Sequence, residues 1–227
     1  ADISDMINTG NTTPFIYAGW ENTIVNTGTK MLEFMQDKAS IKDVADQLDE
    51  DQDSVVNNQP EVITTATEEI SQESCAKLVG RCFAEATGSD VALISLGTWI
   101  SGNGTNQNND GVSGKLYAKN ITDYDICTIL PTGWSQTIQT VRLTGKQIQD
   151  LYKEGYDAVG TGNNYPYVLV SPMELEDEKT YQVAISGISE KLASEAEVTD
   201  SGIVGMDAAK EFFGQFETLS EADAEWK

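Results

Sequence analysis

Histidine is absent from this sequence of 227 residues, and basic residues are few. The lack of histidine removes the usual general base, the Ser–His and Cys–His nucleophile pairs and the imidazole ligands of catalytic zinc. Lysine and arginine together number 14 against 37 acidic residues, which gives a formal net charge of −23. A field of that sign repels the phosphate backbone of nucleic acids. We therefore expect no nucleic-acid partner.

The sequence also lacks a continuous apolar run of about 18 residues, the length that a membrane-spanning helix needs. We expect no membrane span in this chain. Because it opens with Ala1 and has no secretory apolar region, any export signal or neighbouring domain is expected to lie outside it. Of the three cysteines, Cys75 and Cys82 are about two turns apart on one predicted helix, too far for a disulfide. We predict that these two and Cys127 are buried apolar residues.

The residues that are present divide the chain into a smaller first part and a larger second part. Residues 1–60 are expected to form a helical segment and linker, with helices over 22–36 and from Ser40 to the acidic cluster at 49–53. This segment is interpreted as a possible tail of an upstream domain. The main domain is expected over 61–217, followed by an acidic tail at 218–227.

Hydrophobic patterns in the main domain predict alternating helices and strands. The predicted strands are 62–67, 91–94, 136–143, 167–170 and 180–185. The predicted helices are 71–86, 145–154, 189–196, 207–216 and a short one opened by a Thr122–Asp125 capping box. Residues 102–114 are rich in Gly and Asn and predict a long loop. The interleaving predicts a mixed α/β (α+β) fold, in which helices flank a mixed sheet.

The residues by themselves indicate no catalytic or metal site. The spacing of Asp49, Asp51 and Asp53 is that of a calcium loop, but the positions that need Gly and Glu hold Ser54 and Pro60. The Gly-rich stretches at 102–105 and 160–162 contain no basic residue, so they are interpreted as turns. No two carboxylates are singled out as an acid/base pair. We therefore assign no catalytic residue, no metal ligand and no cofactor to this chain.

Two stretches of the second part carry a family resemblance: Ala86-Thr87-Gly88-Ser89-Asp90 with the apolar strand after it, and Val141-Arg142-Leu143-Thr144-Gly145-Lys146-Gln147-Ile148. With the order of the segments between them, they resemble the C-terminal, substrate-recognition domain of the 5'-nucleotidase family over about 62–216. That resemblance implies a separate metallophosphatase domain that holds the divalent metals and performs hydrolysis. A chain without histidine is not that domain, so it would be the domain that grips the nucleoside, without catalysis of its own.

The same resemblance implies positions for ligand contacts, several of which are altered here. Where the family has N-x-G-G-I-R, this chain has Ser95, keeps Gly97 and places Ile100 at the arginine position. In the family's L-P-F-G-N loop, the base-stacking Phe and the base-reading Asn are replaced by Thr132 and Trp134. A later aromatic that completes the stack would be Tyr165 or Tyr167. The substrate-binding residues implied in this way are Ser95, Gly97, Thr132, Gly133, Trp134, Tyr165 and Tyr167.

Two interpretations of these changes remain open. In one, Trp99, Trp134 and the two tyrosines still line a cleft and stack a flat ring of a nucleoside, nucleotide or sugar-linked ligand. In the other, the cleft has lost nucleotide recognition and the fold serves as a structural or interaction module. Residues 15–48 resemble the last helices of extracellular solute-binding proteins of ABC importers, so such a module could belong to a cell-surface solute-binding protein. Either way the location implied is extracellular or cell-surface, with the periplasm as the alternative.

Overall fold

The computed structural model describes residues 26–57, 60–97, 100–102, 105–107, 111–112, 114–157, 164–186 and 190–226. The chain divides into two compact units, Ala1–Val62 and Ile63–Lys227. Each unit is described separately below.

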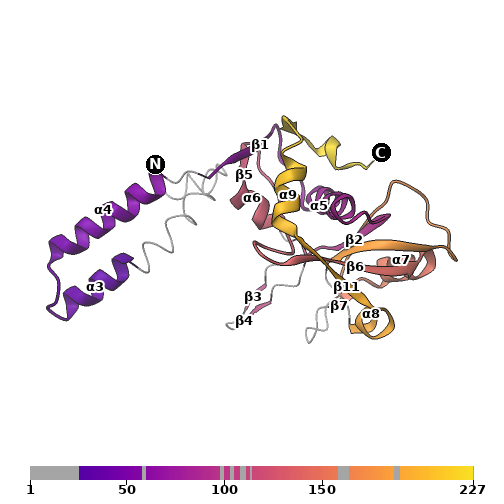
Figure 1. Cartoon of the computed structure of the whole chain (residues 1–227), viewed down its shortest axis with the longest axis horizontal. Helices are drawn as coiled ribbons and strands as arrows, with labels where there is room; N and C mark the ends of the chain where they lie inside the picture. Colours follow the sequence, from indigo (N-terminus) through magenta and orange to yellow (C-terminus); the bar gives the residue numbers. More distant parts are fainter. Residues whose placement is uncertain are drawn as a thin grey trace. The chain divides into compact units, whose positions relative to one another are not determined.

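The first unit contains two helices, α3 (Gly28–Met35) and α4 (Ile41–Asn57) (Figure 1). The expectation that the acidic cluster ends the second helix is wrong, because α4 continues through it. One carboxylate of that cluster is held inside the unit. Asp51 is 3% exposed and accepts hydrogen bonds from Asn26 Nδ2 (3.1 Å) and Thr27 Oγ1 (2.5 Å). These contacts satisfy the buried carboxylate.

The second unit is built on a mixed sheet of five strands. Their order is β11 (Val198–Val204), β6 (Thr137–Thr144), β10 (Thr180–Ser186), β2 (Val91–Ser95) and β9 (Tyr167–Val170). Strands β2 and β10 run parallel, and the other neighbours are antiparallel. All five residues of β2 are buried, as expected for a strand covered on both faces.

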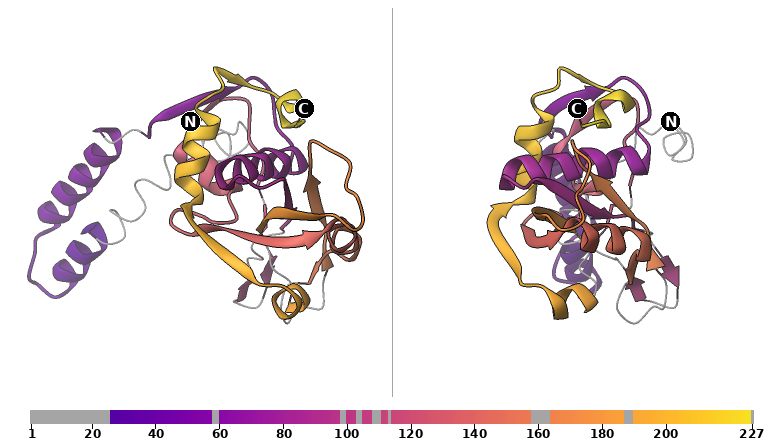
Figure 2. Two further views of the ribbon diagram at one scale, coloured as in Figure 1. Left: turned by 45° about the vertical axis from the view of Figure 1, so that its right-hand side comes forward. Right: turned by 90° about the vertical axis from the view of Figure 1, so that its right-hand side faces the viewer.

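Helices cover both faces of this sheet (Figures 1 and 2). One face carries α5 (Gln72–Thr87), α6 (Asp123–Ile129) and α9 (Gly205–Phe213), which form a core with alternate residues of the strands. The opposite face carries α7 (Gly145–Glu154) and α8 (Glu190–Glu195), which enclose a second core. Because side chains alternate along a strand, each strand contributes to both cores.

The ends of α5 and α7 are set by the residues that the sequence indicated. The Ser71 side chain accepts from Ser74 N (3.2 Å) at the start of α5, and Gly88 ends the helix in the left-handed conformation with φ of 64°. At the start of α7, Thr144 Oγ1 accepts from Gln147 N (3.2 Å), and Gln147 Oε1 accepts from Thr144 N (2.8 Å).

A smaller sheet lies outside the five-stranded one, with the order β12 (Thr218–Leu219), β1 (Val62–Ala66) and β5 (Asn120–Thr122). Residues 218–226, expected within an acidic tail, are thus part of the folded unit. Strand β12 pairs in parallel with β1, and the 3-10 helix η2 (Glu221–Ala224) follows it. This segment belongs to the folded unit because it pairs with β1, a strand far earlier in the sequence.

Two short hairpins complete the described strands. Strand β4 (Thr105–Gln107) lies in the stretch 102–114 that was expected to be a loop, and its partner β3 (Ile100–Gly102) ends at the first residue of that stretch. Strands β7 (Tyr156–Asp157) and β8 (Asn164–Tyr165) form the other hairpin. With these additions, the expected mixed α/β fold, preceded by helices, is confirmed. Within the described residues, no helix has the length and apolar character needed to cross a membrane.

Candidate functional site

Four strands of the large sheet have one end on the same side of the sheet. We call this row of strand ends the site edge. The parallel strands β2 and β10 end there, at Ser95 and Ser186, whereas their antiparallel neighbours β9 and β6 begin there, at Tyr167 and Thr137. The register pairs Ser95 with Tyr167, and Thr137 with Val204 at the end of β11. Ligands of open α/β sheets bind beyond the carboxyl ends of parallel strands, so this edge is the place to look for a site.

The predicted binding residues that the structure describes lie on or beside this edge. Ser95 and Tyr167 are strand ends, Gly97 follows β2, and residues 132–134 form the turn that leads into β6. Tyr165 lies in β8, but its side chain is outside the described residues, as is the whole of Trp99. The sequence order therefore brings segments about 40 residues apart to one edge, because strand pairing requires it.

Ser95 and Gly97 are held by backbone hydrogen bonds. Val112 N donates to Ser95 O (2.8 Å) and Gly97 N donates to Val112 O (2.7 Å), which binds a short segment across the end of β2. Gly111 is needed in that segment, because a Cβ there would lie 2.7 Å from Ser95 Oγ. The Ser95 side chain is consequently fully buried. In this arrangement Ser95 contacts the chain itself and not solvent.

Tyr167 and Thr132 are buried as well. Tyr167 is 3% exposed and belongs to the core beneath α7 and α8. Thr132 is 9% exposed, and among the described residues its Oγ1 has no hydrogen-bond partner. That oxygen lies against the first residue of α9, where a Cβ on Gly205 would overlap it. Both side chains therefore support the fold around the site edge.

Trp134 differs from these neighbours because the residue is 48% exposed. The preceding residue, Gly133, adopts a left-handed φ of 55°, which lets the turn present Trp134 at the surface. One side of the indole meets Tyr124 of α6 in an edge-to-face contact, with 5.2 Å between ring centroids and 74° between planes. Sequence reasoning missed Tyr124, since nothing in the pattern of α6 distinguishes it from an ordinary helix residue.

The site edge is uncharged where the structure describes it. The segments 95–97, 111–112, 130–137 and 164–167 contain no acidic or basic residue. Within the described part of the chain, no group of three His, Cys, Asp or Glu side chains could hold a metal ion. The geometry suits a flat uncharged ring laid against Trp134, and these four segments provide no cation for a phosphate group.

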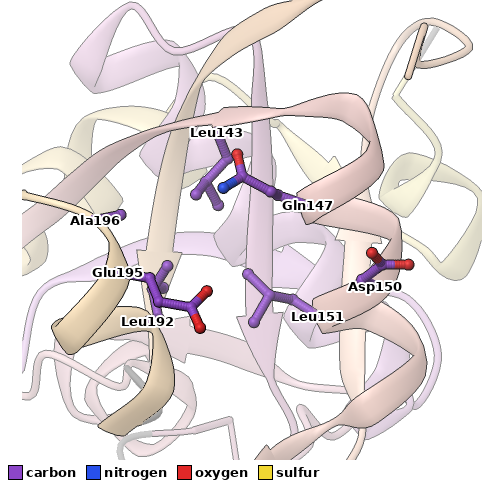
Figure 3. A pocket seen from close by; sticks show the side chains of 7 residues that line it. All are labelled: Leu143, Gln147, Asp150, Leu151, Leu192, Glu195 and Ala196. Carbon is purple, nitrogen blue, oxygen red and sulfur yellow. The ribbon is translucent and has the colours of Figure 1, made fainter. Parts of the chain in front are cut away.

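A small cavity lies between α7 and α8, on the sheet face that these two helices cover. Its volume is about 80 Å³, and Figure 3 shows Leu143, Leu151 and Leu192 at its centre with Asp150 and Glu195 at the sides. Ligand sites are roughly 300–1,000 Å³ in volume, so this cavity is too small for a nucleoside. This cavity is therefore not a nucleoside site.

Comparisons with known proteins give one family-model match and several similar solved structures. The family model of the 5'-nucleotidase C-terminal domain matches residues 54–171. The 5'-nucleotidase precursor from Thermus thermophilus is 16% identical, with 80% of this chain and 44% of that chain covered and a TM-score of 0.48. The NAD nucleotidase NadN from Haemophilus influenzae is 10% identical, with 81% and 42% covered and a TM-score of 0.46. A putative 5'-nucleotidase from Staphylococcus aureus, in complex with alpha-ketoglutarate, is 10% identical, with 75% and 43% covered and a TM-score of 0.45.

This chain spans less than half the length of each of these solved structures. Among curated proteins, no sequence matches it. The family model covers 118 of the 227 residues (54 to 171 inclusive), from α4 to the end of β9, and it includes every binding position predicted above. The chain belongs to the 5'-nucleotidase C-terminal domain family.

Proposed function

We propose that this chain is the nucleotide-recognition-type domain of a secreted 5'-nucleotidase-like hydrolase and does not catalyse hydrolysis itself. The divalent metals and the reaction would belong to a separate domain of the same polypeptide. Family membership supports the type of domain, and the lack of histidine supports the absence of the metal chemistry. An extracellular or cell-surface location is part of this proposal.

One observation carries the ligand class: an exposed Trp134 ring, braced by Tyr124, at an uncharged site edge. Stacking on an aromatic ring is worth roughly 1–3 kcal/mol per base and tolerates any planar ring. The segments 95–97, 111–112, 130–137 and 164–167 supply no Lys or Arg to a phosphate, and Lys210 of the adjoining α9 is paired with Asp123 at 3.5 Å. We therefore infer a preference for nucleosides over nucleotides.

The test is a titration of the protein with nucleosides, nucleotides, nucleotide sugars and plain sugars. Binding is measured by the change in tryptophan emission and by the shift in melting temperature. The variant Trp134→Ala should lose the response, whereas Tyr152→Ala should retain it. Tyr152 is a matched control because its side chain is 49% exposed on α7, on the face of the sheet opposite to α6. An equal response in both variants, or silence across the panel at millimolar ligand, would contradict the proposal.

A second candidate is a ligand-binding or structural module of a cell-surface solute-binding protein. It is favoured by α3 and most of α4, which precede the start of the family match at residue 54. Under this alternative the protein would respond to plain sugars alone, or to no ligand, in the same titration.

A further inference from the structure

A groove lies between α5 and α9, on the sheet face that carries the larger core. Its volume is about 470 Å³, within the range of ligand and peptide pockets. Ala86, Ala208 and the largely buried Phe212 form apolar parts of its lining, while Glu85, Asp207 and Glu211 contribute carboxylates. Figure 2 shows the two helices next to each other at this place. The groove thus combines apolar surface with negative charge.

The carboxylates of α9 have no cation of their own. Asp207 and Glu211 are one helical turn apart and exposed. Among the described residues, neither has a lysine or arginine within ion-pair distance, whereas Glu85 across the groove pairs with Arg81 at 2.7 Å. Since the whole chain carries a net charge of −23, the surrounding field adds to their attraction for cations.

Beside the groove, Arg81 shows how a cation binds to two residues of its lining, Phe212 and Glu85. The guanidinium carbon of Arg81 lies 5.4 Å from the centroid of the Phe212 ring, while its Nε pairs with Glu85. An aromatic face and a carboxylate are the two groups that recognise arginine or lysine side chains. Asp207 and Glu211 supply the carboxylates for a second cation, brought from outside.

We propose that this groove docks a basic amphipathic segment of a partner protein, with Lys or Arg on Asp207 and Glu211 and aliphatic side chains on Ala86, Ala208 and Phe212. A second copy of this chain is a poor occupant, because two chains of charge −23 repel each other. Its cations are also largely engaged internally: Lys77, Lys115 and Lys119 all form intrachain ion pairs.

The probe is a fluorescein-labelled peptide of about 14 residues, rich in Ala and Leu, with two lysines one helical turn apart. Fluorescence anisotropy measures its dissociation constant in 20 mM and 200 mM NaCl. A peptide with glutamine in place of both lysines is the ligand control. We expect the lysine peptide to bind at micromolar concentration, and the glutamine peptide at least ten-fold more weakly.

Two double variants separate docking in the groove from attraction to net charge. Asp207→Asn with Glu211→Gln should weaken the lysine peptide at least ten-fold at 200 mM NaCl. Glu174→Gln with Glu178→Gln removes the same charge from exposed positions outside the groove and should change affinity less than two-fold. Ala208→Trp, which fills the groove, should also abolish binding, and circular dichroism checks that each variant is folded.

Three outcomes would overturn the proposal. The first is equal weakening by the two double variants, which indicates non-specific attraction. The second is no binding of the peptide at 100 µM. The third is self-association in sedimentation velocity that Ala208→Trp abolishes, which would make a second copy the occupant.

Discussion

The three cysteines differ in how strongly burial suppresses their thiolates. Cys75 and Cys82 are buried in α5, whereas Cys127 in α6 is half-buried, so the expectation of burial is only partly met there. Burial raises the pKa of Cys75 from 9.0 to about 12, which leaves about 1,000-fold less thiolate. Burial also raises the pKa of Cys82, and burial together with the Asp123 charge raises that of Cys127.

We therefore expect Ellman's reagent at pH 8 to label Cys127 in the native protein and to leave Cys75 and Cys82 at least 100-fold slower. In 6 M guanidinium chloride all three should react quickly. A Cys127→Ser variant should lose the native reaction. Rapid labelling of more than one thiol per native chain would contradict the burial of α5.

Asp125 holds the start of α6 through a buried ion pair. Its carboxylate, 5% exposed in the side chain, accepts from Lys119 Nζ at 2.7 Å and from Thr122 N and Oγ1 at 3.0 and 2.9 Å. Asp125→Ala removes the buried carboxylate that pairs with Lys119 and caps α6, and should lower the free energy of unfolding by about 3 kcal/mol in urea denaturation. As a control, Glu69→Ala breaks an exposed pair with Lys115 and should cost less than about 1 kcal/mol. Equal losses in both variants would show that burial of the pair is immaterial.

At the scale of elements, α5 approaches the sheet at Gly80. A Cβ at this position would lie 2.6 Å from Val170 Cγ2 and 3.0 Å from Ile94 Cγ1, closer than packed atoms tolerate. Alanine gains about 1 kcal/mol in helix propensity over glycine, but overpacking costs about 1–3 kcal/mol. We expect Gly80→Ala to lower the unfolding free energy by about 1 kcal/mol. Adding Val170→Ala should recover part of it, which a double-mutant cycle measures; strict additivity would refute the contact.

The 3-10 helix η2 stabilises the start of α5 through Glu221, whose Oε1 accepts from Ser71 N at 2.9 Å. Burial by itself would raise the pKa of Glu221, but hydrogen bonds from Ser74 and Ser71 outweigh it and lower the pKa below 4.5. A carboxyl whose pKa is lowered by folding contributes stability that is fully present above the unfolded-state pKa of 4.5. That stability is lost as the pH falls from 4.5 through the lower folded-state pKa. Glu221→Gln should therefore cost stability at pH 7 and become harmless at the acid end of a pH series. A difference that does not vary with pH would contradict this linkage.

Local signals explain which elements the sequence could predict. Helices α5 and α7 were expected nearly to the residue, because Ser71, Gly88 and the Thr144–Gln147 pair act within one turn of chain. Strands β5, β11 and β12 were missed, since they depend on partners far away in sequence. The end of α4 was misplaced because it also depends on distant residues. Asp51, inside the helix, accepts hydrogen bonds from Asn26 and Thr27.

The predicted binding positions that the structure describes lie along one edge, but the sequence did not indicate the exposure of their side chains. Family motifs led to Ser95, Thr132 and Tyr167, yet the first is covered by Gly111, the second by α9 and the third by a core. Trp134 is exposed because of a glycine turn and an aromatic neighbour ten residues earlier, Tyr124. Such burial depends on strand register and packing, which no single motif encodes.

At the scale of the whole molecule, a charge of −23 opposes compaction by self-repulsion. Several ion pairs are exposed i,i+3 or i,i+4 contacts, which contribute little to the free energy of unfolding. Salt screens their attraction as it screens the repulsion between like charges. Raising NaCl from 10 to 500 mM should therefore increase the Tm by a few degrees, about 3 °C or more, in thermal unfolding followed by circular dichroism. KCl should act like NaCl, since screening depends on ionic strength alone. A constant or falling Tm would mean that attractive pairs outweigh the repulsion.

The strand ladder of the large sheet stops at Ser95, Thr137 and Ser186, before the neighbouring connections begin. Residues 131–135 form such a connection. None of them belongs to either hydrophobic core, and only Thr132 is buried. Randomising 134 and 135 while Thr132 and the left-handed Gly133 are kept would thus give a display library on a constant framework, much as variable loops are carried by antibody domains. The edge at which natural ligands are sought is also the place where new specificities could be selected.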